Sequence, residues 1–282
     1  MDDNFYITYA RSYPDTIIPY VEENNIPLMT SAMNRYSTTT GKFKEMNEYN
    51  TPRVVDSGGF TAMEKFGEYP WTVEQYHEWL SNNSNKFDWV AVMDLACEEK
   101  FDHKLTKRER MEKTIENTVK HFELDPDYEL IPVLQGRSAS DYIWSYNKLK
   151  ENDIPVENVG LGTVCRISSS FKLVDLEAKL RKHCPDIENI HGFGVKFTAF
   201  SCGATFESAD SFAWSYPTKF GEVWVWDESG QKITTINTDN MSKENKLYTS
   251  LVNYHKYVNK IKERQRPVTT SLGFSHKLPM DR

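Results

Sequence analysis

The segment RVVDSGGFTAMEKF (residues 53–66) joins an apolar run to a glycine pair and then to an aromatic residue. Val54 and Val55 are β-branched, which favours the end of a buried strand. Asp56 follows this strand directly, and a serine and two glycines come next. Because Asp, Ser and Gly are also common in turns, this segment alone leaves two interpretations open: an ordinary turn, or a functional carboxylate at the tip of a strand.

The composition is that of a folded protein with a large core. Of the 282 residues, 39% are hydrophobic and 27% are charged, and the length is normal for a single α/β barrel. The sequence contains no apolar run of the roughly 18 residues that a membrane span needs, and its N-terminus lacks the pattern of a signal peptide. We therefore expect one domain over residues 1–282, in the cytoplasm (the host cytoplasm if the source is viral), without membrane contact.

Apolar runs alternate with amphipathic segments along most of the chain. Most of the runs are continuous, as in strands of a parallel sheet that is covered on both faces. The predicted strands span residues 5–10, 26–33, 53–58, 89–95, 130–136, 158–164, 191–196 and 208–214.

Helices are predicted between these strands. Residues 72–80 and 106–124 each begin with a capping box, Thr72 with Gln75 and Thr106 with Glu109. Two more follow the strands at 130–136 and 158–164, and a last helix is expected at about 243–264. Apolar stripes at helical spacing are formed by Met111, Ile115, Val119 and Phe122, and by Leu247, Leu251, Tyr254, Val258 and Ile261.

This order of elements predicts a (β/α)8 TIM barrel. Residues 222–237 depart from the pattern, because they alternate apolar and polar residues around a Ser-Gly turn. They predict a β-hairpin between the last strand and the last helix.

The ends of the predicted strands carry polar side chains that a barrel would bring to one mouth. Asp56, Asp94 and Asp210 lie at three of these ends, and Gln135 lies at a fourth. Two carboxylates suit glycosyl transfer, one as nucleophile and one as acid/base. A further carboxylate with an amide suits the edge of a purine.

The histidines and cysteines do not form a metal-binding motif. Cys97, Cys165, Cys184 and Cys202 are too far apart for a CxxC pair, and we expect reduced thiols. His191 alone lies at a predicted strand, at its start, and we interpret it as structural. The sequence therefore predicts neither a metal nor a cofactor.

Five motifs, VVDSGGFTAM, VAVMDLAC, PVLQG, VGLGTV and HGFGVK, resemble the tRNA-guanine transglycosylase superfamily over roughly residues 50–215. Members of this superfamily exchange guanine for a 7-deazaguanine base on a (β/α)8 barrel. The resemblance therefore implies a pentosyltransferase with this fold.

The resemblance also implies a role for each motif residue. Asp56 matches the acid/base aspartate, and Asp94 and Gln135 match the pair that reads guanine. Phe60 and Phe193 match the residues on the two faces of the base. The other implied substrate-binding positions are Ser57, Gly58, Gly59, Gly160, Leu161, Gly162 and Gly194.

The sequence departs from the family pattern in two places. It lacks the CxCxxC…H zinc site that tRNA-acting members carry after the barrel. The nucleophile pattern Asp-x-Phe-Asp is represented by ADSFAWS, in which Asp210 is kept and Ala213 replaces the second aspartate. We take Asp210 as the nucleophile by elimination, and the alternative is that Asp56 attacks the sugar itself.

These departures make the chain more similar to the branch that acts on DNA, the 7-deazapurine DNA-modification transglycosylases of phages and bacteria (DpdA type). The implied partners are a guanine nucleotide in DNA and a free 7-deazaguanine such as preQ0 or preQ1, and a homodimer is a possible assembly. The alternatives are a tRNA-guanine transglycosylase without the zinc site, a non-catalytic subunit that binds a base or nucleic acid, and an unrelated barrel glycosidase.

The segment at residues 256–266 is rich in Lys and Arg, although the chain has a net charge of −7. We expect Lys260, Lys262, Arg264 and Arg266 to contact the phosphate backbone. The alternative is an ordinary solvated helix end.

Overall fold

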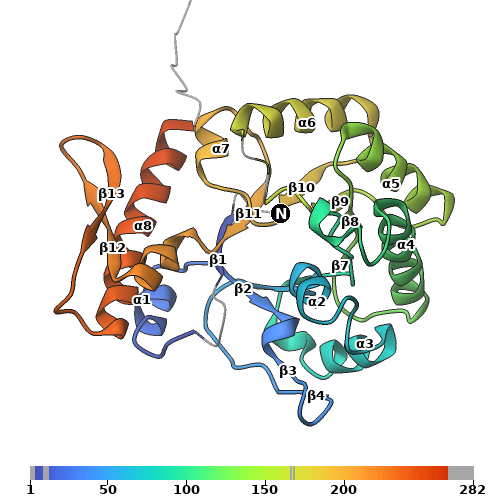
Figure 1. Ribbon diagram of the computed structural model, residues 1–282, viewed down its shortest axis with the longest axis horizontal. Helices are drawn as coiled ribbons and strands as arrows, with labels where there is room; N and C mark the ends of the chain where they lie inside the picture. The colour runs from blue at the N-terminus through green and yellow to red at the C-terminus, as the bar shows by residue number, and fades with distance from the viewer. Residues whose placement is uncertain (1–3, 9–12, 166, 168, 266–282) are drawn as a thin grey trace, which may run out of the picture.

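The computed structural model describes residues 4–8, 13–165, 167 and 169–265, and its centre is a barrel of parallel strands (Figure 1). Around the barrel lie β1 (Asn4–Thr8), β2 (Leu28–Ser31), β5 (Arg53–Asp56), β6 (Trp89–Ala91), β7 (Leu130–Ile131), β8 (Val133–Leu134), β9 (Asn158–Leu161), β10 (Asn189–Gly192) and β11 (Ser208–Ser211). β11 pairs in parallel with β1, next to β2.

Pro132 separates β7 from β8 at the point where the barrel closes. β7 pairs with β6 and β8 pairs with β9, so the two short strands are halves of one barrel strand. Pro132 has no N–H to donate, but its carbonyl accepts from the Gly160 N–H at 2.9 Å. The neighbouring Ile131 carbonyl accepts from the Val92 N–H at 3.1 Å on the other side. The described strands therefore form the predicted (β/α)8 barrel.

Helices surround this barrel (Figure 1). Those described are α1 (Ile18–Glu23), α2 (Gly59–Lys65), α3 (Val73–Ser81), α4 (Lys107–Glu123), α5 (Ala139–Glu151), α6 (Ser170–His183), α7 (Thr198–Ser201) and α8 (Lys243–Gln265). Both predicted capping boxes are confirmed, at Thr72 for α3 and at Thr106 for α4. Within the described chain, none of the helices is both long enough and apolar enough to cross a membrane.

The predicted hairpin is confirmed between the last barrel strand and the last helix. Its strands are β12 (Glu222–Asp227) and β13 (Lys232–Asn237), which pair antiparallel. A 3₁₀ helix that the sequence did not predict, η4 (Ala213–Phe220), precedes it. Both η4 and β12 pack against α8, and the predicted apolar stripe of α8 is buried.

Some details differ from the predictions. The strand predicted at 191–196 spans Asn189–Gly192, so His191 lies inside β10 and not at its start. The strand predicted at 208–214 ends at Ser211, because the chain turns there into η4. A short hairpin, β3 (Tyr36–Ser37) with β4 (Lys42–Phe43), was not predicted.

The buried face of α4 also differs from its predicted apolar stripe. Val119 and Phe122 are only partly buried, whereas Thr114 and Thr118 are buried. Each threonine hydroxyl donates to a carbonyl one turn earlier, at 2.9 and 2.7 Å. Because these hydroxyls are satisfied within the helix, they can face the core.

Two layers of side chains fill the strand ends that position the site. The lower layer is an apolar cluster formed by Tyr6, Met29, Val54, Trp89 and Ile131. Side chains two residues further along a strand point to the same side. The upper layer therefore contains Thr8, Ser31 and Asp56, which follow Tyr6, Met29 and Val54 at this spacing, together with Asp210 on β11.

Candidate active site

Four adjacent strands carry two carboxyl groups and two hydroxyl groups in the upper layer. In the order β11, β1, β2 and β5, these residues are Asp210, Thr8, Ser31 and Asp56. The Thr8 hydroxyl donates to Asp210 Oδ2 at 2.7 Å. Ser31 stands opposite Asp56 in the strand register, and its hydroxyl bonds to the Asp56 carboxyl group. Each acid thus has a hydroxyl donor on a neighbouring strand.

Asp210 is buried, and two donors hold its carboxyl group. Besides Thr8, the Gly194 N–H donates to its Oδ1 at 2.7 Å. Gly194 has a φ of +67°, and a side chain there would also meet the Cys165 Cβ at 2.7 Å, so glycine is required at this position. These donors fix the orientation of the carboxyl group.

His191 lies next to Asp210, a position that the structural interpretation of the sequence did not anticipate. Its Nε2 is 3.5 Å from Asp210 Oδ1, and its Nδ1 is 2.8 Å from the Ser208 hydroxyl. The ring is fully buried, and its Nε2 has no hydrogen-bond partner among the described residues. The imidazole is therefore part of the surroundings of this carboxyl group.

The Asp56 side chain is partly exposed to solvent, yet its pKa lies far from the usual range of an aspartate. Burial, together with the charges of Asp94 and Asp210, raises the pKa of Asp56 to about 7. Hydrogen bonds from the Gly58 N–H and the Ser31 hydroxyl act in the opposite direction. A carboxyl group with a pKa near 7 can both give and take a proton at neutral pH.

The turn after Asp56 brings the β5 end against the segment after β6. The Ser57 hydroxyl donates to Asp94 Oδ1 at 2.8 Å. Gly58 has a φ of +85°, and α2 begins directly after it. A Cβ on Gly59 would clash with the Asp94 carbonyl, so the close approach depends on the absence of a side chain. The segment is thus both a turn and the carrier of the carboxylate.

Asp94 and Gln135 form the amide–carboxylate pair of the site. Gln135 Nε2 donates to Asp94 Oδ2, and the Thr163 hydroxyl donates to Gln135 Oε1 at 2.6 Å. Both side chains are buried, and burial raises the pKa of Asp94 although the bonds from Ser57 and Gln135 lower it. The second N–H of the amide and the remaining lone pairs of the carboxylate are the groups that could meet a purine edge.

The expected base-stacking residues lie in different surroundings. Phe193 is half-buried, and its ring lies 4.6 Å from that of His191 and so close to Gly160 that a Cβ there would clash. Phe60 contacts Phe101, with ring centroids 5.6 Å apart, and the Lys100 ammonium lies 4.1 Å from its centroid. Stacking on a base stays a prediction for both.

The remaining predicted positions can be placed only in part. The Leu161 side chain lies in the core outside the barrel, so only its backbone could touch a ligand. Lys260 forms an ion pair with Glu263 at 3.0 Å, and Lys262 is partly buried. The Arg264 side chain and the whole of Arg266 lie outside the described residues. Phosphate contact by this segment stays a prediction.

Sequence reasoning missed four polar residues of the site: Thr8, Ser31, Tyr69 and Thr163. The Tyr69 hydroxyl lies 2.8 Å from the Ser57 hydroxyl and donates to the Asp94 carbonyl at 2.8 Å. Thr8 and Ser31 lie inside the strands predicted at residues 5–10 and 26–33, and only the structure shows that they close β1 and β2. Tyr69 lies in a loop without a local signal, whereas Thr163 lies in the motif VGLGTV, directly after the predicted position Gly162.

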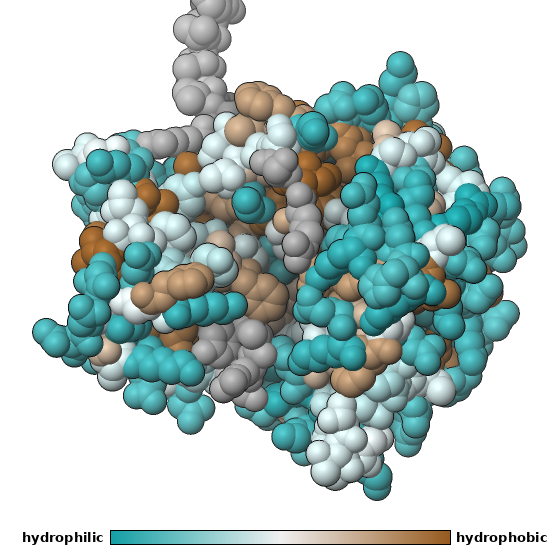
Figure 2. Space-filling view, in the orientation of Figure 1, coloured by the Kyte–Doolittle hydropathy of each residue, from teal (hydrophilic) through white to brown (hydrophobic). Residues whose placement is uncertain are grey.

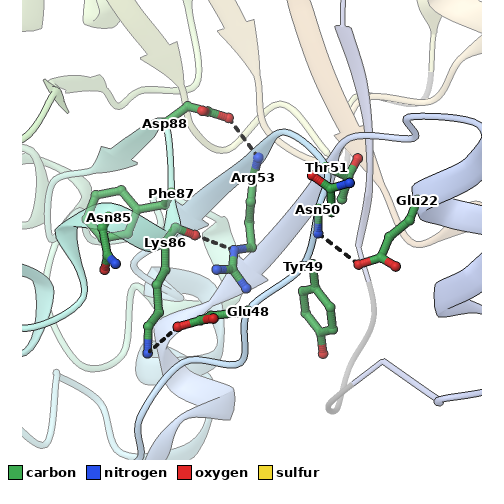
Figure 3. A pocket seen from close by; sticks show the side chains of 10 residues that line it. All are labelled: Glu22, Glu48, Tyr49, Asn50, Thr51, Arg53, Asn85, Lys86, Phe87 and Asp88. Carbon is green, nitrogen blue, oxygen red and sulfur yellow. Dashed lines mark hydrogen bonds and ion pairs between the residues drawn. The ribbon is translucent and has the colours of Figure 1, made fainter.

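One cavity of about 550 Å³ lies away from this mouth (Figure 3). Its lining includes Arg53, the first residue of β5, and Asp88, which directly precedes β6, so it is at the opposite end of these strands. The Arg53 N–H donates to Asp88 Oδ2 at 2.7 Å, and the Asn50 N–H donates to Glu22 Oε1 at 2.8 Å. Residues that line this cavity thus form hydrogen bonds with one another, and we do not assign a reaction to it.

Among the described residues, no three His, Cys, Asp or Glu side chains are grouped as a metal site.

Comparison with known protein families gives a match over most of the chain. The sequence model of the family described as "DpdA: DeoxyPurine in DNA protein A" matches residues 18–222, which is most of the chain. No curated protein matches the sequence significantly.

Replacing Gly162 by Ala should weaken the affinity for guanine by about tenfold or more, because the new Cβ would overlap the Gln135 amide and displace it from Asp94. Calorimetric titration with guanine measures the effect. In the control Gly230→Ala, the new methyl group meets the Asp227 side chain at 2.5 Å in the β12–β13 turn, and this variant should bind as the wild type does. Equal affinity in Gly162→Ala would exclude the proposed base position.

Replacing Asp56 by Asn should remove part of the pH dependence of stability. The folded pKa of about 7 exceeds the unfolded value near 3.8, so this group stabilises the fold fully below about pH 4, and the contribution is lost as the pH rises through 7. We expect the wild type to lose roughly 1–3 kcal/mol of unfolding free energy in this range through Asp56, and the variant to keep it.

Urea unfolding between pH 4 and 8 measures this difference. Asp175→Asn removes an exposed carboxylate that pairs with Lys179 on α6, and this control should keep the wild-type pH dependence. Parallel curves for wild type and Asp56→Asn would contradict the shifted pKa.

Proposed function

This chain belongs to the DpdA family, and we propose that it exchanges a guanine in DNA for a 7-deazaguanine base through a covalent intermediate on Asp210. Membership of the family implies a DNA-guanine transglycosylase of 7-deazapurine DNA modification. The observation that carries the chemical part is the pair of acids in one layer: Asp210 held by fixed donors, and Asp56 with a pKa of about 7.

The first half of the proposed reaction breaks the glycosidic bond. A guanine is flipped out of the helix, because the sugar carbon C1′ cannot be reached inside a duplex. An Asp210 oxygen attacks C1′, the bond from C1′ to N9 breaks, and protonated Asp56 gives its proton to N9. The products are an aspartyl–sugar ester and neutral guanine.

The second half runs in the opposite direction with another base. Guanine leaves and a 7-deazaguanine such as preQ0 or preQ1 takes its place. Its N9 attacks C1′, the ester bond breaks, and the N9 proton passes to ionised Asp56. The Asp210 carboxylate is regenerated, and Asp56 is again protonated, so the cycle consumes no further reactant.

Base choice in this proposal rests on Asp94 and Gln135. The carboxylate accepts from N1–H and the exocyclic amine, and the amide donates to O6. A 7-deazaguanine presents the same edge, which lets both bases use the site. Because both groups are buried, a base that left them unpaired would bind less well by roughly 2–3 kcal/mol.

A rival assignment gives the attack to Asp56, and one observation favours it. Asp56 is partly exposed, whereas Asp210 is 4% exposed and accepts hydrogen bonds on both oxygens. The second aspartate of the superfamily's nucleophile pattern is no alternative nucleophile here, because Ala213 occupies that position at the start of η4. The two assignments differ in which side chain carries the sugar.

The overall reaction is tested with guanine-containing DNA and, separately, tRNA, each with labelled guanine or a 7-deazaguanine. Nucleoside mass spectrometry should show labelled 2′-deoxyguanosine or a 7-deaza-2′-deoxyguanosine from DNA, and no labelled or 7-deaza nucleoside from tRNA. Exchange in tRNA alone would support an RNA enzyme. Binding of guanine without exchange in either would support a non-catalytic subunit.

The covalent step is tested by denaturing electrophoresis of protein with DNA, followed by peptide mapping of any adduct. We expect an adduct on Asp210 in the wild type, a slower one in Asp56→Asn, and none in Asp210→Asn. Because guanine departure needs protonated Asp56, wild-type adduct formation should fall as the pH rises through 7, and this dependence should be absent in Asp56→Asn.

The same experiment distinguishes the rival assignment. An adduct on Asp56, or undiminished adduct in Asp210→Asn, would assign the nucleophile to Asp56. Normal exchange by both variants would remove the pair from the mechanism.

A further inference from the structure

We infer that the exposed face of η4 is a stacking surface for the DNA bases next to the guanine that enters the active site. This inference rests on the proposed function, because it assumes that DNA lies across the barrel mouth. It concerns a surface outside the upper layer of Thr8, Ser31, Asp56 and Asp210, which is called the catalytic layer below.

Two aromatic side chains of η4, and a third on the residue directly before it, are open to solvent. Phe212, Tyr216 and Phe220 are 43%, 54% and 64% exposed, although large apolar residues are usually buried. On the side of the molecule where the hairpin and α8 lie, Figure 2 shows scattered hydrophobic patches between polar ones. The rings of Tyr216 and Phe220 are 5.4 Å apart and edge to face, so they form a continuous aromatic surface.

The opposite face of η4 is fixed to the catalytic layer. Trp214 is fully buried, and its indole N–H donates to the Thr8 carbonyl at 2.6 Å. The hydroxyl of the same Thr8 holds Asp210. The Ala213 carbonyl accepts from the Trp224 indole at 2.7 Å, which ties η4 to the hairpin. The aromatic face therefore has a fixed position relative to Asp210, two residues before Phe212.

The charge of this face suits a nucleic acid. The Lys219 ammonium lies 5.5 Å from the centre of the Tyr216 ring, where it could meet a phosphate beside a stacked base. Lys246 approaches the end of η4 at Gly221, and Glu222, which is half-buried, follows in the chain. Proteins commonly bind unstacked bases with aromatic rings that lie beside positively charged groups.

The length of η4 defines which bases could reach it. Eight residues at about 2.0 Å each extend about 16 Å, and stacked bases of one strand are about 3.4 Å apart. The surface thus fits the nucleotides up to about four positions from the target guanine. Flipping a base removes its stacking partners, and an aromatic surface at this place would replace them.

The test uses DNA oligonucleotides with a single guanine and 2-aminopurine at one of the four positions on either side of it. Wild-type protein should change the 2-aminopurine fluorescence on one side of the guanine. Tyr216→Ala and Phe220→Ala should remove this change and weaken DNA binding by about tenfold each, with unchanged affinity for free guanine.

Matched variants separate stacking from simple hydrophobic contact. Phe220→Trp should keep both signals, whereas Phe220→Leu should behave as Phe220→Ala does. Ile236→Ala removes another exposed apolar side chain, 49% exposed on β13, and should bind as the wild type. Wild-type DNA affinity in the η4 variants, full rescue by Leu, or a defect confined to tRNA would overturn the inference. Guanine exchange by the wild type is measured in parallel, so that failure of the proposed reaction is seen separately from failure of the stacking surface.

Discussion

The burial of Asp56 beside Asp94 and Asp210 at one barrel mouth is the constraint with which the rest of the site must be compatible. Carboxylates in a poorly solvated site cannot all be ionised without cost. Burial and its two neighbours raise the pKa of Asp56 to about 7, so this group holds a proton up to neutral pH. The same burial and repulsion that destabilise the folded protein as the pH rises to 7 would supply the acid/base group of the proposed reaction.

The donors around the three acids differ, and in the proposed reaction each acid has a different role. Asp210 receives the Thr8 hydroxyl and the Gly194 N–H and lies next to His191, so its direction is fixed. Asp94 receives Ser57 and Gln135 and is thereby built into a recognition pair. Asp56 receives the Gly58 N–H and the Ser31 hydroxyl and is more exposed than the other two acids. Such a division of similar groups by their environments is a common way to separate nucleophile, reader and proton carrier.

The barrel strands position the polar side chains of the site, and η4 follows β11 next to them. Thr8 connects the two regions, since its hydroxyl binds Asp210 and its carbonyl accepts from Trp214 of η4. Where the sequence pattern of the superfamily expects a zinc site, this chain places η4 and a hairpin packed on α8. Aromatic packing and hydrogen bonds therefore hold η4 and the hairpin in place beside the strand ends of the site.

The sequence by itself determined the barrel, the hairpin and the residue types of the site. Continuous apolar runs, capping boxes and the polar residues that end the runs are local signals, and they predicted Asp56, Asp94, Gln135 and Asp210 at strand ends. Only the tertiary structure decided which of these groups touch and how they titrate. The contacts of Thr8 with Asp210 and of Tyr69 with Asp94 join segments 202 and 25 residues apart, and His191 reaches Asp210 through the pairing of β10 with β11. Strand register, burial and distances between charges are set by the packing of the whole barrel, so no local pattern carries them.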